Sequence, residues 1–206
     1  MRARRLSLGS ALVAVVTLAA LASPATATVM EALSLDDLAR GASHVVEGEV
    51  TSKRVYLRGG VPWTDTTVKL SRVLMGSATR GQSMVVRQPG GELGTLGLRV
   101  SGAATMRRGE TVMLFVRPVR GVYVPVGMTQ GKYELYKDSA GTWRARRDLS
   151  GVSFAQLNST GAVVIRPEVS TSQQNPTLAT LRLQVQKAVQ AVVAERAAAA
   201  KVGGGK

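Results

Sequence analysis

Residues 44–53 read HVVEGEVTSK, and this stretch decides the fold class because its hydropathy repeats every two residues. Val46, Gly48 and Val50 fall on one face of an extended chain, whereas Glu47 and Glu49 fall on the other. Such alternation is typical of a strand with one buried face. We therefore expect a half-buried strand to begin at residue 44, with its acidic face turned away from the core.

Turn residues and apolar runs divide the next hundred residues in the same way. The apolar run at 111–116 suits a strand buried on both faces. The other expected strands occupy residues 64–74, 84–86, 122–126, 132–136 and 142–147. Residues 89–97 hold too many glycines for a regular element and are expected to form a loop. The pattern predicts a mainly β fold, a small antiparallel barrel that is oligonucleotide-fold-like, with a sandwich as the alternative.

Two helices are expected to flank the strands. Residues 34–42 form a short N-terminal helix, in which Ser34 and Asp37 stand at the positions of a capping box. A C-terminal helix follows Asn175 and Pro176, since apolar residues recur at helical spacing between residues 178 and 192. We interpret Asn175 as its cap and Pro176 as its first residue.

The N-terminus has the pattern of a secretory signal. Three arginines lie within the first five residues, residues 11–22 are apolar apart from Thr17, and Ala25 and Ala27 form a small-x-small cleavage site. The apolar run is too short for a membrane-spanning helix. The expected organisation is a signal peptide at 1–27, a β-barrel-like domain at 28–148, a linker at 149–175, a C-terminal helix at 176–201 and a mobile tail at 202–206.

The amino-acid composition excludes some kinds of site and indicates the charge of the expected partners. The 206 residues include no cysteine, which excludes disulfides, thiol catalysis and cysteine metal sites. The formal net charge is +14, and loss of the three arginines in the signal would leave +11. A basic balance of this size indicates attraction to anionic partners and says nothing about the fold.

An anion-binding patch is the candidate site. Arg144 and Arg146 project together from an expected strand, and Arg147 follows them. Guanidinium groups suit phosphate, sulfate or carboxylate ligands. The anion-binding patch is the sharper interpretation, and the preferred one is a solvated face over a core tryptophan, Trp143.

Catalytic patterns are missing from the sequence. His44 is the only histidine, and we expect it to be a solvated residue at the start of its strand. Gly131-Lys132 lacks the rest of a phosphate loop, and no nucleophile elbow occurs. The acids are scattered, without a spacing that indicates a carboxylate pair. We expect no catalytic residue, no metal and no cofactor; whether the protein is an enzyme stays open, with a non-enzyme favoured.

Four segments together carry a resemblance to a known family. They are HVVEGEV at 44–50, the stretch 67–76 ending in VLMG, the stretch from PGG at 89–91 to GETVMLF at 109–115, and VGMTQGKY at 126–133. Over roughly residues 34–137 the chain resembles a family of uncharacterised exported bacterial β-domain proteins. The resemblance implies a secreted, barrel-like domain and brings no activity. His44 stands where the family pattern has an acid.

The sequence thus predicts an exported, periplasmic or extracellular protein with a basic surface and a non-enzymatic binding or scaffolding role. The expected partner is an anionic envelope polymer or another envelope protein, without specific nucleic-acid binding and without a transmembrane anchor once the signal is removed. Two alternatives stay open. One is a hydrolase whose site is assembled only in three dimensions, and the other is a protease-inhibitor-like barrel.

Overall fold

The computed structural model describes residues 28–150, 152–157, 163–167 and 175–203. The expected signal peptide at 1–27 lies outside the described residues, as does the end of the expected tail, 204–206. The first strand and helix are β1 (Thr28–Glu31) and α2 (Leu35–Gly41). The strands that follow are β2 (His44–Arg58), β3 (Val61–Met75), β4 (Ser83–Pro89), β5 (Gly91–Leu93), β6 (Leu96–Leu98), β7 (Thr111–Val119) and β8 (Val122–Pro125). The chain continues through the 3-10 helix η1 (Met128–Gly131), β9 (Lys132–Lys137), β10 (Trp143–Arg146), β11 (Val152–Leu157), β12 (Val163–Pro167) and α3 (Leu178–Gly203).

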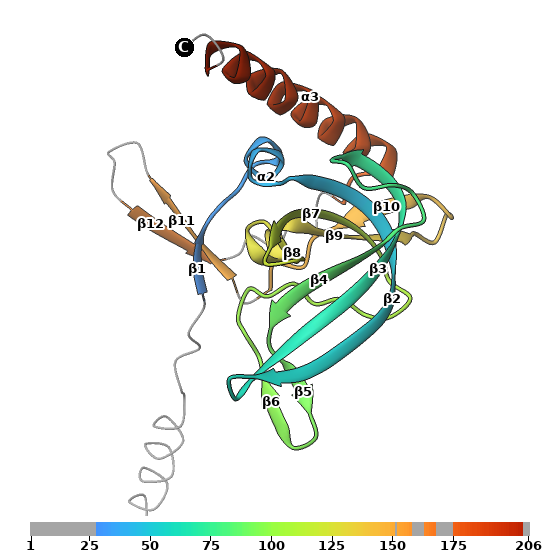
Figure 1. Ribbon diagram of the computed structural model, residues 1–206, viewed down its shortest axis with the longest axis vertical. Coiled ribbons are helices and arrows are strands. Elements are labelled where there is room, and N and C mark those ends of the chain that lie inside the picture. The colour runs from blue at the N-terminus through green and yellow to red at the C-terminus, as the bar shows by residue number, and fades with distance from the viewer. Residues whose placement is uncertain (1–27, 151, 158–162, 168–174, 204–206) are drawn as a thin grey trace, which may run out of the picture.

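Five strands close into a ring, in the order β7-β2-β3-β4-β8, and β8 pairs again with β7. The neighbours are antiparallel except β4 and β8, which meet in parallel at Val86 and Tyr123. β9 and β10 extend the sheet beyond β7. The mainly β fold with a short early helix and a C-terminal helix is therefore confirmed. The ring corresponds to a small five-stranded barrel rather than two stacked sheets (Figure 1).

Bulges bend the long strand that organises the ring. The pairing of β2 with β3 shifts register between Val45 and Val46, between Glu47 and Gly48, and between Val50 and Ser52. Gly48 allows the close approach, because a Cβ there would lie 2.5 Å from the carbonyl oxygen of Lys69. Bulges curve a strand and increase its twist. This curvature lets β2 pair with β3 on one edge and with β7 on the other.

The apolar residues form two clusters on opposite faces of the ring. The inner cluster fills the barrel with Val46, Val50, Val68, Leu70, Met84, Val86, Met106, Val112, Leu114 and Val116. The outer cluster joins the outside of β2, β7 and β9 to the helices and includes Val45, Met113, Phe115, Tyr133, Leu135, Leu38, Leu181, Val185 and Val192. β2 and β7 are thus buried on both faces, as predicted for residues 111–116 but not for residue 44 onward.

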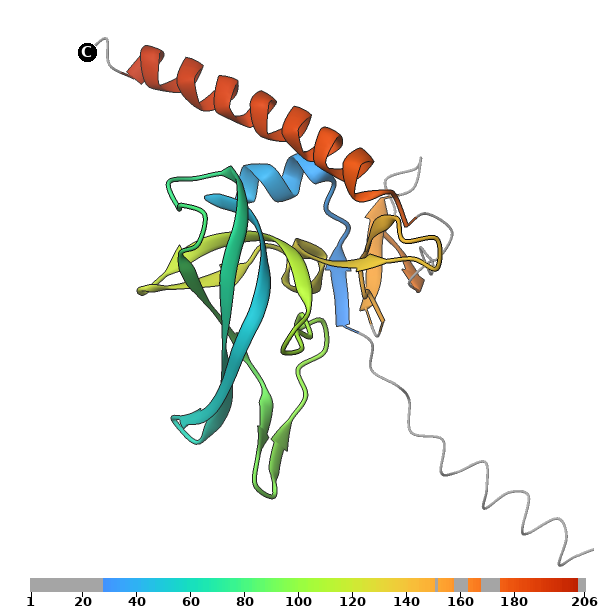
Figure 2. The same cartoon turned by 90° about the vertical axis from the view of Figure 1, so that its right-hand side faces the viewer.

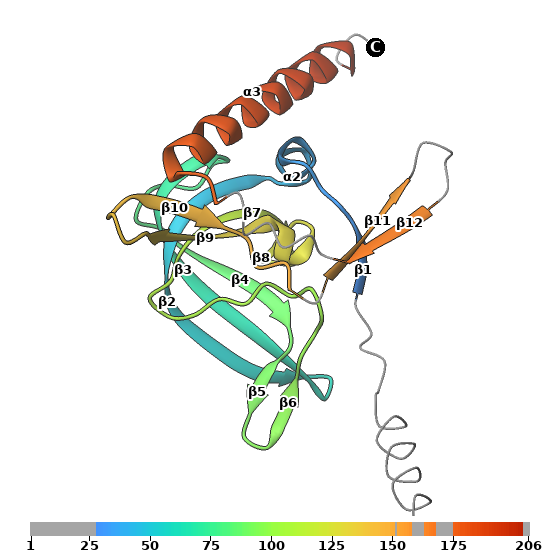
Figure 3. The same cartoon turned by 180° about the vertical axis from the view of Figure 1, so that it is seen from behind.

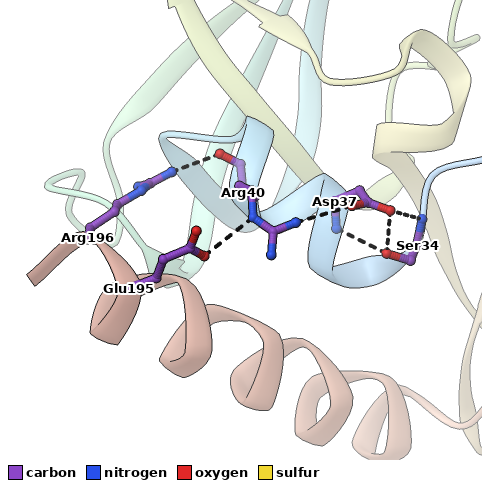
Figure 4. Close-up of polar contacts among 5 residues, drawn as sticks. All are labelled: Ser34, Asp37, Arg40, Glu195 and Arg196. Atoms are coloured by element: carbon purple, nitrogen blue, oxygen red, sulfur yellow. Dashed lines mark hydrogen bonds and ion pairs between the residues drawn. The ribbon is translucent and has the colours of Figure 1, made fainter. Parts of the chain in front are cut away.

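The short helix α2 has the expected capping box. The Ser34 hydroxyl accepts the Asp37 N–H at 3.1 Å, and the Asp37 carboxylate accepts the Ser34 N–H at 3.1 Å. α3 lies across α2, and two of its charged side chains contact α2 (Figure 4). Glu195 pairs with Arg40, while Arg196 donates to the carbonyl oxygens of Arg40 and Ala42 at 2.9 and 3.0 Å. These bonds satisfy carbonyls at the C-terminal end of α2.

α3 begins two residues later than expected. Its first residue is Leu178, and Thr177 caps it, since the Thr177 hydroxyl accepts the Thr180 N–H at 3.1 Å. The prediction of Asn175 as the cap was wrong, because Asn175 instead donates from its amide to the Tyr136 hydroxyl. No helix in the described part of the chain is long and apolar enough to cross a membrane.

Two segments hold more structure than the sequence predicted. The expected loop at 89–97 contains the small hairpin of β5 and β6, which turns at Gly94 with a φ of 62°. The expected linker at 149–175 contains β11 and β12, which pair with each other, while β11 also pairs in parallel with β1. This three-stranded sheet lies beside the barrel (Figure 3).

Candidate functional site: a groove at the mouth of the barrel

A groove of about 1000 Å³ lies between the far ends of β2, β3 and β4 and the segment that returns from β6 to β7. The strand side contributes Lys53, Val55, Thr64, Thr66 and Gln88. The returning segment contributes residues 97–107, and Thr129, Asp148 and Ser150 also line the groove. Mouths of β-barrels are frequent ligand sites because the surrounding strands provide a preformed concave surface.

The barrel interior changes from apolar to polar as it reaches this groove. Val68 belongs to the inner apolar cluster, whereas Thr66 and Thr64, two and four residues away on the same strand, line the groove. Gln88 follows Val86 on β4 in the same alternating manner. The inward-facing side chains of β3 and β4 therefore change from apolar in the core to polar at the floor of the groove.

The returning segment is fixed to the floor by a glutamine. With its amide oriented to satisfy both atoms, Gln88 donates to the Ala104 carbonyl at 2.9 Å and accepts the Ala104 N–H at 2.8 Å. Gln88 is buried, so these two bonds replace the water that its amide would otherwise need. These two bonds hold the backbone of the returning segment at Ala104 in a fixed position beside β4.

A buried lysine also holds the returning segment in place. Lys132 donates from Nζ to the Thr105 carbonyl at 2.6 Å and forms an ion pair with Glu110. Glu110 in turn accepts the Arg107 N–H at 2.7 Å. Both charged side chains are nearly inaccessible, and a buried pair of this kind is destabilised strongly when one partner is lost. The ion pair therefore holds residues 105–107 in place along the groove.

The groove carries three cations and two acids. Lys53, Arg99 and Arg107 line it, and no ion pair joins them to a carboxylate within the described part of the chain. The acids are Glu92 and Asp148. Hydrogen bonds from the Ser150 hydroxyl and N–H hold the pKa of Asp148 below its ordinary value, and the nearby Lys132 and Arg107 add to this effect. Asp148 is thus a stable anion, and the groove as a whole has an excess of positive charge.

The predicted arginine patch is brought together on β10, but its charges are used within the molecule. Arg144 donates from Nε to Asp138 at 2.6 Å, and Arg146 makes two bonds to Glu134 at 3.0 and 2.7 Å. Hydrogen bonds to these carboxylates raise the pKa of both guanidinium groups. Arg147 packs over the Tyr133 ring at 5.1 Å. Anion binding by this patch stays a prediction.

Two expectations about single residues were wrong. Trp143 is not a core tryptophan, because 41% of it is exposed, and Ala145 alone is buried on that side of β10. His44 is not solvated, because only 8% of it is exposed. Its ring packs against Gly76 and edge-on to Tyr123 at 5.1 Å, and Ser43 Oγ lies 2.9 Å from Nδ1. Burial lowers the pKa of His44 below its ordinary 6.5.

Sequence reasoning missed the groove, and its signals were weak. Arg99 and Arg107 follow the glycine-rich stretch at 89–97, and Lys132 stands within an otherwise strand-like run. Each has an ordinary explanation in the sequence, as an exposed cation or a turn residue. Among the described residues, no group of three or more histidine, cysteine, aspartate or glutamate side chains could hold a metal ion. No protein-family model matches the chain, and a search of curated proteins gives no match.

Proposed function

We propose that this protein is exported and acts at the cell envelope or outside the cell as a non-enzymatic binding protein for an anionic polymer. The groove at the barrel mouth is the observation that carries the proposal. It is preformed, large enough for part of an extended ligand, and lined by Lys53, Arg99 and Arg107. The net charge of the chain would draw a polyanion toward it.

A rigid frame supports binding rather than a transient contact. Gln88 and Lys132 hold the returning segment at Ala104 and Thr105, between the two arginines of the groove. Cations placed on a fixed backbone lose less conformational freedom on binding than cations on a mobile loop. A segment of anionic polymer that enters the groove would therefore meet positive charges at set positions.

A hydrolase is the less favoured alternative. A general acid needs a raised pKa at neutral pH, whereas the pKa of Asp148 is lowered by its hydrogen bonds to Ser150. The only histidine is buried against Tyr123 and Gly76, away from the residues that line the groove. These observations favour a binding role for the groove.

The test compares two pairs of arginines. Dextran sulfate serves as the anionic probe and neutral dextran as its control, at salt from about 0.01 M to about 0.15 M. Arg99→Gln with Arg107→Gln should weaken dextran sulfate binding several-fold. Arg80→Gln with Arg117→Gln removes the same charge from exposed positions outside the groove and should have the smaller effect. Equal losses in the two variants, or no binding by the parent at the lowest salt, would overturn the proposal.

A further inference from the structure

Two hairpins project side by side from the end of the barrel that lies opposite α2 and α3 (Figure 2). One joins β2 to β3 through Gly59 and Gly60, and the other joins β5 to β6 through Gly94 and Thr95. The two hairpins touch, since a Cβ on Gly91 would lie 2.6 Å from Thr64 Oγ1 and 2.8 Å from Val55. This contact lies at the start of β5, and the turns of both hairpins project beyond it as separate ends (Figure 2).

Both hairpins carry large apolar side chains that are exposed. We name these side chains the tip cluster: Leu57, Val61, Leu93, Leu96 and Leu98. Between 37% and 49% of each is exposed, which is a large exposed apolar area for two neighbouring hairpins. None of these five side chains belongs to the inner or the outer apolar cluster, so they do not contribute to the described core.

Aromatic and basic residues lie beside the tip cluster on the same hairpins. Tyr56 and Trp63 pair across the first hairpin, one step behind Leu57. Within residues 53–65 and 91–99 the cations are Lys53, Arg54, Arg58 and Arg99, and the acids are Asp65 and Glu92. Asp65 is neutralised by two hydrogen bonds from Arg87, both of 2.7 Å. The two hairpins therefore combine exposed apolar side chains with a net positive charge, and Arg58 lies beside the first turn itself.

We propose that the two hairpin tips dock this protein on an anionic lipid surface. Apolar side chains on convex turns can enter the interface between headgroups and acyl chains, where aromatic side chains are also enriched. Arg58 beside the first turn and the other cations of the hairpins would attract anionic headgroups, each adding to the attraction.

Charge argues against a second copy of the chain as the occupant. Tip-to-tip association would bring Arg58, beside the first turn, close to the same residue of the other molecule, and like charges across an interface oppose association. A bilayer of anionic lipid has the opposite charge and adapts its shape to a convex surface. The lipid surface therefore fits both the apolar and the charged features of the tips.

The experiment is sedimentation with vesicles. The protein is purified in the form that the cell holds, and parent and variants share the same N-terminus, so differences between them report the tips. Equal parts of phosphatidylglycerol and phosphatidylcholine form the anionic vesicles, and phosphatidylcholine alone forms the neutral ones. The parent should bind the anionic vesicles, and raising salt from about 0.01 M to about 0.15 M should weaken this binding.

Two variants separate the contributions. Leu93→Ser with Leu96→Ser should weaken binding to anionic vesicles about tenfold or more, because the variant no longer transfers two leucine side chains from water into the lipid interface. Arg58→Gln with Arg99→Gln should weaken it and reduce its dependence on salt. Leu183→Ser with Val193→Ser is the matched control, since these apolar residues on α3 are at least as exposed as Leu93 and Leu96. It should bind like the parent.

The proposal is overturned if the parent binds neither kind of vesicle at the lowest salt, or if the leucine variant binds like the parent. It is also overturned if the parent dimerises without lipid and the leucine variant does not, because the tips would then serve a second copy. Circular dichroism of each variant checks that the fold is kept. Arg107→Gln lies in the groove and outside the tips, so retention of vesicle binding in this variant separates the present proposal from polymer binding.

Discussion

Arg182 on α3 and Glu47 on β2 are joined by two parallel hydrogen bonds, of 2.7 and 2.6 Å, across 135 positions of the chain. The Glu47 side chain is only 3% exposed, so the Arg182 guanidinium supplies most of the positive charge that offsets the cost of burying this carboxylate. Arg72, 4.0 Å away, is a weaker partner. The bidentate geometry is the strong form of a charge-assisted bond. It fixes the C-terminal helix onto the outside of the barrel.

Arg182→Ala should therefore lower the free energy of unfolding by about 2–4 kcal/mol, because a buried carboxylate loses its partner. Urea unfolding at neutral pH measures the change. Lys187→Ala removes an exposed cation from the same helix and should change stability by less than about 0.5 kcal/mol. A loss in the Arg182 variant no larger than in this control would show that the pair does not hold α3 in place.

The same residues show where prediction from sequence stops. The alternation of Val46, Gly48 and Val50 predicted the strand, since a local pattern reports a local preference. The burial of Glu47 could not be predicted, because it depends on α3, which lies near the C-terminal end of the chain. The partner of an acid in a strand is not encoded in its sequence neighbours, so Glu47 was expected on an open face.

The groove was unpredictable for a related reason. Lys53, Arg99 and Arg107 are brought together only when Gln88 and Lys132 hold the returning segment across the barrel mouth. β11 and β12 were missed because their strand character depends on pairing with each other and with β1. In contrast, α2 was predicted correctly, since its capping box involves residues only three positions apart.

Stability should depend on pH through His44. Burial lowers its pKa in the folded state, so between that pKa and about 6.5 the unfolded chain binds more protons than the folded one. The free energy of unfolding should therefore be greatest above about pH 6.5 and fall as the pH is lowered below it. His44 is the only histidine, so denaturant unfolding across this range isolates its effect. His44→Gln should flatten the profile, and an unchanged slope would contradict the assignment.

Phe115 tests the outer cluster. It is fully buried on β7 and packs against Tyr133 with ring centroids 6.3 Å apart. Phe115→Ala should lower the free energy of unfolding by about 3–5 kcal/mol through lost burial and a cavity. Val119→Ala, at an exposed position on the same strand, is the control. A loss below about 1 kcal/mol for Phe115→Ala would be the size of a surface substitution and would place the core elsewhere.

Processing of the N-terminus is predicted to occur after Ala27. The positive end, the apolar run and the small pair at Ala25 and Ala27 all support this position. N-terminal sequencing of protein recovered from the periplasm or the medium should find Thr28 first. A protein that keeps Met1 and stays with the cytoplasmic fraction would contradict both the cleavage and the proposed export.

The arginines of β10 provide the last test, because they compete with the groove as the anion site. Arg144 and Arg146 already bind Asp138 and Glu134, so an external anion would have to displace a carboxylate held at 2.6–3.0 Å. Arg144→Ala with Arg146→Ala should therefore bind dextran sulfate almost as well as the parent at each salt concentration. Arg99→Gln with Arg107→Gln, which removes the same charge from the groove, should bind clearly less well. If the β10 variant instead loses more affinity than the groove variant, the strand patch is the binding site, and the carboxylates of Asp138 and Glu134 serve to orient its guanidinium groups for the ligand.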